Sequence, residues 1–247
     1  MSWTNYKDKL KRYFWFSGKE LKEFIIVVLV FGFILSFNQW GEQTFNLSQG
    51  INSLVIGIII VGLSLFAHHA VQRMASLAYG FQPLNKMWLP GIIICIIVLL
   101  ATKGKLMIFA ATSFWIQQMK LHRLGWYRYG PNVKHLGRIA FFSILANILI
   151  AAIAYVVFKA TGSAIANEFV IFNLMFAGYN LLPLPPLDGS RIFYASRMLY
   201  IFAFTGFLAY VLLTALAGLA GIMPILIAIG VGIACMIAFF AYFEMKW

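Results

Sequence analysis

Long apolar runs separated by short polar segments dominate this chain. A run of about 20 predominantly apolar residues is typical of a membrane-spanning helix. The pattern predicts an all-α polytopic membrane protein with six transmembrane helices and little chain left for a soluble domain. The predicted spans are residues 21–37, 51–79, 139–158, 168–182, 199–217 and 223–243.

Residues 91–118 do not fit the pattern of a span. The apolar run 91–100 (GIIICIIVLL) is too short to cross a bilayer, which indicates a re-entrant piece. Residues 106–118 are rich in β-branched and aromatic side chains and are therefore strand-like. We expect a single transmembrane domain at residues 24–247, with 91–118 as its short re-entrant or strand-like segment.

Composition supports the membrane assignment. The chain is 62% hydrophobic and 11% charged, which excludes an ordinary soluble domain. Its net charge of +12 would suit nucleic acid in a soluble protein. In a membrane protein it indicates topology instead, because Lys and Arg collect on the cytoplasmic side. We therefore expect no nucleic-acid partner.

The distribution of charge orients the six spans. With the N-terminus in the cytoplasm, every Lys and Arg except Lys159 falls on the cytoplasmic side. The C-terminus is then cytoplasmic too, and the expected location is the plasma membrane of a prokaryote. Residues 1–23 are basic and aromatic and predict an interfacial segment whose partner is membrane lipid. A plain topology anchor is the alternative for this segment.

One carboxylate stands out in residues 180–190 (NLLPLPPLDGS). Asp188 is the only acidic residue between Glu168 and Glu244, and an ionisable group at membrane depth is by default a candidate functional residue. The prolines around it prevent a regular helix, and Gly189 frees the backbone just after it. Irregular backbone at this depth needs protein or a water-filled cavity around it. The segment therefore predicts a carboxylate held at a buried, hydrated position.

A second polar cluster interrupts the second apolar run. His68, His69, Gln72 and Arg73 follow the apolar residues 51–67 on what is predicted to be one helix. Residues four positions apart share a helix face, so His68 and Gln72 lie together. His69 points about 100° away.

Together these clusters resemble the site-2 protease family of intramembrane zinc metalloproteases. Residues 179–192 (YNLLPLPPLDGSRI) are similar to the family's N-x-x-P-x-x-P-L-D-G motif, with Asn180, Pro183, Pro186 and Gly189 in place. The family's G-P-x-x-N motif is matched by SILAN, in which Asn147 is kept. Residues 16–24 (FSGKELKEF) resemble the archaeal-type branch. The resemblance implies that Asp188 is a metal ligand and that Asn147, Asn180, Pro183, Pro186 and Gly189 support the cleft.

The zinc motif departs from the family pattern. In the family, a glycine follows the second His of the H-E-x-x-H motif by eight residues. If that glycine is Gly80, the motif falls on residues 68–72, which read HHAVQ. His68 is kept as a metal ligand, His69 replaces the catalytic Glu, and Gln72 replaces the second His. A neutral amide is a poor zinc ligand, and an imidazole titrates about two units above a carboxylate. Only two good zinc ligands therefore remain, His68 and Asp188. If the site is degenerate, we expect it to bind no zinc.

Each of these residues also has a purely structural interpretation. His68 and Gln72 suit hydrogen bonds between helices, and His69 suits a cavity wall. Asp188 suits an ion pair with Arg73, Arg191 or His68. Asn147, Asn173 and Asn180 are also typical of hydrogen bonding between membrane helices.

Three functions follow from these interpretations. The first is a catalytically degenerate homologue, a pseudoprotease, that binds transmembrane helices or a partner membrane complex. The second is an active zinc-dependent intramembrane metalloendopeptidase that cleaves single-span substrates with a rearranged site. The third is a small transporter or channel, for which the sequence offers no second intramembrane acid and no paired broken helices.

Overall fold

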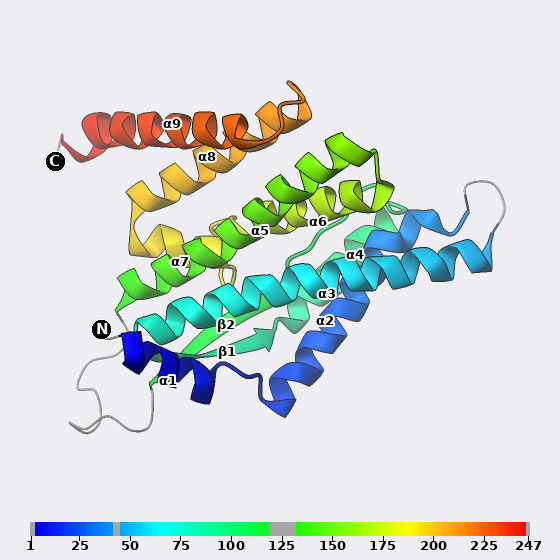
Figure 1. Cartoon of the computed structure of the whole chain (residues 1–247), viewed down its shortest axis with the longest axis horizontal. Coiled ribbons are helices and arrows are strands. Elements are labelled where there is room, and N and C mark those ends of the chain that lie inside the picture. Colours follow the sequence, from blue (N-terminus) through cyan, green and yellow to red (C-terminus); the bar gives the residue numbers. More distant parts are fainter. Residues whose placement is uncertain (1–2, 42–44, 119–131, 246–247) are drawn as a thin grey trace. The chain divides into compact units, whose positions relative to one another are not determined.

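Two compact units make up the computed structural model, residues 1–132 and 133–247 (Figure 1). Residues 3–41, 45–118 and 132–245 are described by the structure. Both units are mainly helical, and the first also contains a two-stranded sheet.

The first unit is built on two long helices that pack side by side, α2 (Gly18–Ser36) and α3 (Leu47–Ala78) (Figure 1). Small residues permit the close approach, since a Cβ on Gly57 would lie 3.0 Å from the carbonyl oxygen of Gly32. A short helix, α1 (Trp3–Tyr13), precedes α2 and contacts α3. A single 3₁₀ turn, Phe37–Gln39, follows α2.

The sheet of the first unit is an antiparallel pair. Strand β1 (Phe81–Met87) pairs with β2 (Thr112–Gln118), with Phe81 opposite Gln118 and Met87 opposite Thr112. Helix α4 (Leu89–Ala101) lies between the two strands in the chain. Strand β1 also packs against α3 and α2, so it lies beside the polar turn of α3.

The second unit consists of helices. Helix α5 (Val133–Thr161) packs against α6 (Ala164–Asn180) and against the short α7 (Asp188–Ala195). Helix α8 (Arg197–Ala215) packs against α9 (Ile222–Phe239), which continues as a π-helical turn, Phe240–Glu244. Tyr155 on α5 donates from its hydroxyl to the Thr214 carbonyl at 2.9 Å and so ties α5 to the end of α8.

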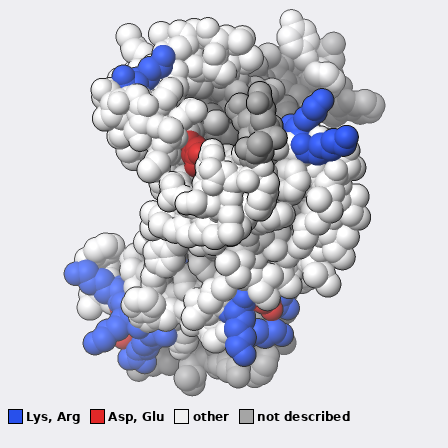
Figure 2. Space-filling view, turned by 90° about the vertical axis from the view of Figure 1, so that its right-hand side faces the viewer, with Lys and Arg blue, Asp and Glu red and all other residues white. Residues whose placement is uncertain are grey.

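Four helices among the described residues are long and apolar enough to cross a membrane. They are Leu47–Ala78, Val133–Thr161, Arg197–Ala215 and Ile222–Glu244. The first and fourth of the six predicted spans form helices α2 and α6, which are not among these four. Helix α2 carries four charges in its first six residues, and α6 has only 17 residues. On the face shown in Figure 2 the surface is mostly uncharged, and Lys and Arg gather in a few separate groups.

The predicted re-entrant segment 91–118 divides into two elements. Its apolar run forms α4, and its β-rich part forms β2, which confirms the strand-like prediction for residues 112–118. The other strand, β1 at residues 81–87, has no predicted counterpart. This strand contains Pro83 and Lys86, which weaken the usual strand signal.

Candidate functional site

The polar turn of α3 is buried in the first unit. His68, His69, Gln72 and Arg73 each expose 4% or less of their surface. Long polar and charged side chains are rarely buried without partners, because desolvation costs free energy unless hydrogen bonds or ion pairs replace water. Their neighbours on α2 and β1 therefore decide what this turn does.

Asn85 on β1 connects the two residues that replace the Glu and the second His of the zinc motif. Its Nδ2 donates to Gln72 Oε1 at 2.8 Å and also contacts His69 Nδ1. His69 Nδ1 lies 3.4 Å from the same Gln72 oxygen. The Gln72 oxygen, the atom of its amide that suits a metal ion, is thus an acceptor within this cluster.

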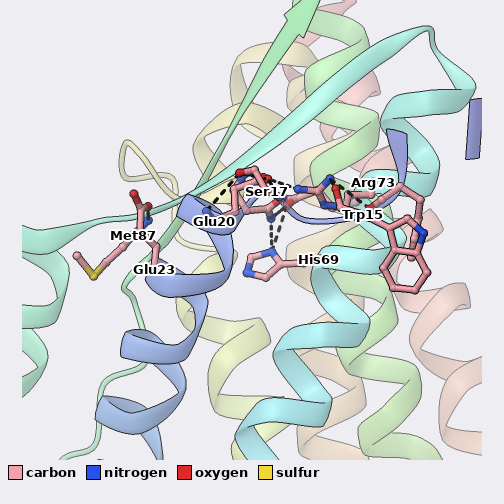
Figure 3. A network of polar contacts seen from close by, with 10 residues as sticks. Trp15, Ser17, Glu20, Glu23, His69, Arg73 and Met87 are labelled. Atoms are coloured by element: carbon pink, nitrogen blue, oxygen red, sulfur yellow. Dashed lines mark hydrogen bonds and ion pairs between the residues drawn. The ribbon is translucent and has the colours of Figure 1, made fainter. Parts of the chain in front are cut away.

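Arg73 forms the centre of a second set of contacts, with the start of α2. Its Nη2 forms a buried ion pair with Glu20 Oε1, which also accepts from the Asn85 backbone N–H at 3.0 Å. Its Nη1 donates to the carbonyl oxygens of Phe14 and Trp15, each at 3.3 Å. Figure 3 shows this network from α2, α3 and the segment before α2. Arg73 was one of the three predicted partners of Asp188, and in the structure it pairs with Glu20 of its own unit.

Glu20 is held by the local sequence as well as by Arg73. Ser17 and Glu20 form a capping box at the start of α2: Glu20 Oε2 accepts from the Ser17 backbone N–H at 2.8 Å, and the Ser17 hydroxyl accepts from the Glu20 N–H. The carboxylate therefore cannot leave Arg73 without also disturbing the first turn of α2. Met87, at the end of β1, donates its N–H to Glu23 Oε2 at 2.8 Å and fastens the strand to the next turn of α2.

A small cavity of about 10 Å³ lies between these elements. It is lined by Glu20, Glu23, His69, Asn85 and Thr112 among others. A volume of this size is about the minimum for one water molecule. The cavity therefore has no room for an organic ligand or a peptide.

Asp188 lies in the second unit and is 3% exposed. It is the first residue of α7, where the partial positive charge of a helix N-terminus favours a carboxylate. Ser143 Oγ on α5 lies 3.1 Å from Asp188 Oδ2 and 2.8 Å from the Ala140 carbonyl oxygen, so its one proton can serve either acceptor. Burial lowers the pKa of the Arg191 guanidinium, and the negative charge of Asp188 opposes that shift. Asp188 thus has a serine hydroxyl and a nearby cation within its own unit.

The proline-rich loop places Asp188 against the end of α6. A Cβ on Gly189 would collide with the backbone carbonyls of Leu181 and Leu182, so only glycine fits there. Pro183 is exposed, Pro186 is half-buried, and the bond between Pro185 and Pro186 is cis. The motif therefore serves to bring the first turn of α7 into contact with the end of α6.

The asparagines of the second unit bond within and between helices. Asn147 on α5 donates to Asn173 Oδ1 on α6 at 2.8 Å, which is the hydrogen bonding between helices that the structural interpretation predicts. Asn180 donates to the Phe176 carbonyl at 2.9 Å. Its Oδ1 is buried and has no hydrogen-bond partner among the described residues, so it remains available as an acceptor.

The described residues do not fit a zinc ion in the first unit. Within either unit, no group of three or more His, Cys, Asp or Glu side chains among them is placed to hold a metal. His68 is the single imidazole that the motif retains on its face, and the Gln72 oxygen accepts from Asn85. The donor set that zinc prefers, three His, Cys or carboxylate ligands with an open fourth position, is therefore incomplete on α3.

Sequence reasoning did not single out two residues of this network, Glu20 and Asn85. The capping-box spacing of Ser17 and Glu20 could have predicted the local role of the glutamate, but not its partner Arg73, which lies 53 residues later. Asn85 lies in a strand without a clear pattern, and no local signal points to it.

Comparison with known proteins gives a distant similarity. The chain is 26% identical over 186 residues to a Methanocaldococcus jannaschii protein named "Putative zinc metalloprotease MJ0611", covering 72% of this chain and 85% of that protein. No protein-family model matches the chain. No solved structure matches it either. The chain is thus a membrane protein by its four long apolar helices, with a distant similarity to a protein that is named as a zinc metalloprotease.

Proposed function

We propose that this chain is a site-2 protease-like membrane protein that has lost its catalytic centre and binds transmembrane helices. The observation that carries the proposal is the clamp formed by Asn85. It engages Gln72 Oε1 and His69 Nδ1, the side chains at the second-His and Glu positions of the motif. A catalytic turn needs these positions free to hold a metal and to take a proton from water. Here they bond to a strand of their own unit instead.

The second unit offers a surface for a helix. A groove of about 420 Å³ runs between α6 and α8, and its walls are almost entirely apolar. It reaches Leu182, at the start of the proline-rich loop that leads to Asp188. Apolar side chains of a neighbouring transmembrane helix are suitable occupants, because van der Waals packing drives association between helices in lipid. The residues that line it are Leu174, Met175, Gly178, Tyr179, Leu182, Phe204, Phe207, Leu208 and Val211.

Metal content tests the loss of the catalytic centre. We expect the purified natural chain to hold far less than one zinc per chain by mass spectrometry. The double variant His69→Glu/Gln72→His restores the H-E-x-x-H pattern, and we expect it to hold close to one. Adding His68→Ala to the double variant is the control and should remove that zinc. One zinc per natural chain, lost on His68→Ala alone, would contradict the proposal.

A working metalloprotease is the second candidate, favoured by the similarity to a protein named as a zinc metalloprotease. Crosslinking a bound transmembrane helix and testing whether it is cleaved separates the two candidates. A photo-crosslinking residue at Leu208, in the groove, should capture a transmembrane helix, whereas the control position Leu226 on α9 lies outside the groove. Under the pseudoprotease proposal the captured helix stays intact with and without a chelator. Cleavage that a chelator stops, and that Asp188→Ala abolishes, would establish the second candidate instead.

A further inference from the structure

Helix α1 presents a basic face that stays exposed among the described residues of its unit. None of its residues is buried. Lys7, Lys11 and Arg12 are exposed on its outer side, and Trp3 exposes 66% of its surface. Lys7 Nζ lies 5.3 Å from the centre of the Trp3 ring. The helix carries four cations against one acid, Asp8, which pairs with Arg12.

The opposite side of α1 is fastened to α3. Tyr6 donates from its hydroxyl to the Met74 carbonyl at 3.2 Å. The segment that follows α1 is held by Arg73, which bonds to the Phe14 and Trp15 carbonyls and lies 4.2 Å from the centre of the Phe16 ring. The helix therefore has a fixed inner side and a free, charged outer side.

The point of attachment places α1 at the level of a membrane surface. The apolar run of α3 ends at Ala67, and Met74 lies seven residues further on, about 10 Å along a helix axis. Helix α3 has 32 residues, about 48 Å, whereas the hydrocarbon core is about 30 Å thick. The end of α3 that holds α1 therefore extends into the headgroup region, where exposed Trp and Lys side chains are favoured.

We propose that the outer face of α1 binds the anionic headgroups of the membrane that α3 spans. Charge complementarity supports the assignment, because a helix with exposed cations and an exposed tryptophan attracts acidic lipid. Because Arg73 contacts both the segment after α1 and Glu20, lipid binding also steadies the network around Asn85. This inference does not depend on whether the chain is a protease or a pseudoprotease.

Hydrogen exchange of the full chain in lipid nanodiscs tests the proposal. We expect backbone exchange in residues 3–13 to be at least about tenfold slower in discs that contain phosphatidylglycerol than in pure phosphatidylcholine. The triple variant Lys7→Gln/Lys11→Gln/Arg12→Gln should lose this difference. These side chains are exposed, so the variant should keep the unfolding temperature of the natural chain.

A matched control removes three exposed cations elsewhere. Lys105→Gln/Lys134→Gln/Lys159→Gln changes the net charge by the same amount and should keep the phosphatidylglycerol effect on α1. Equal exchange of α1 in both lipids would overturn the proposal, as would an effect that survives in the first triple variant. Loss of the effect in the control variant would also overturn it, because total charge and not α1 would then be responsible.

Discussion

Arg73 is a buried charge on which the stability of the first unit depends. Its ion pair with Glu20 is buried, at 1% and 7% side-chain exposure. Removing one partner of such a pair leaves an uncompensated buried charge, at a cost of about 3–5 kcal/mol. We therefore expect Arg73→Met to lower the free energy of unfolding in detergent by about that amount, measured by circular dichroism during denaturation.

Two further variants show whether charge is the cause. Glu20→Gln keeps the capping box, since glutamine also serves at that position, but removes the negative charge. The double variant Glu20→Gln/Arg73→Met should therefore be more stable than Arg73→Met alone. Arg12→Ala breaks the exposed pair with Asp8 and should cost no more than about 0.5 kcal/mol. A double variant as unstable as the sum of its single changes would show that packing, not charge, holds Arg73.

At the same scale, the sequence predicts which residues are unusual better than it predicts what they contact. His68, Gln72 and Asp188 could be singled out because polar groups in apolar runs need a reason to be there. Their partners could not, since Asn85 and Ser143 are brought to them by packing between distant elements. The resemblance to a zinc motif identified the turn of α3. The bonds from Asn85 on β1 are visible only in the structure.

Among the elements, the contact between α5 and α7 is the one that holds Asp188 against Ser143. Gly137 on α5 makes it possible, because a Cβ there would collide with Ala195 and with the Arg191 carbonyl on α7. Gly137→Ala should therefore destabilise the second unit by about 1–3 kcal/mol, the usual cost of overpacking, measured by unfolding in detergent.

A glycine in open space provides the comparison for Gly137. Gly230 lies in α9, and a Cβ there would meet nothing within 4 Å. Gly230→Ala should be neutral or stabilise the chain by up to about 1 kcal/mol through helix propensity alone. If both changes have the same effect, then the close approach of α5 and α7 does not limit stability.

Element prediction succeeded where one local signal was sufficient. The long apolar runs predicted helices α3, α5, α8 and α9, and the β-branched composition predicted β2. Strand β1 was missed because it exists by pairing with β2 and packing on α3, and neither contact leaves a pattern in residues 81–87. The number of helices that cross the membrane depends on α2 and α6. The sequence predicts both as spans, but neither is among the four long apolar helices.

For the molecule as a whole, the distribution of charge predicts the path of the second unit through the membrane. Helix α5 has 29 residues, about 43 Å, and is long and apolar enough to cross. If α6 crosses back, then Lys134, Arg138, Arg191, Arg197 and Lys246 all lie on one side and Lys159 alone lies on the other. If α6 does not cross, Arg191, Arg197 and Lys246 join Lys159. The positive-inside rule favours the first path and predicts a cytoplasmic C-terminus.

Thiol labelling in intact cells distinguishes the two paths. In a Cys95→Ala/Cys235→Ala background, single cysteines replace Lys134, Thr161 and Phe243, all of which are exposed. An impermeant reagent should label only the cysteine at 161, and lysis should be needed to label those at 134 and 243. Labelling at 243 from outside, with 134 still protected, would mean three crossings in this unit. Helix α6 would then lie within the protein and not span the bilayer, and Asp188 would open toward the outer side.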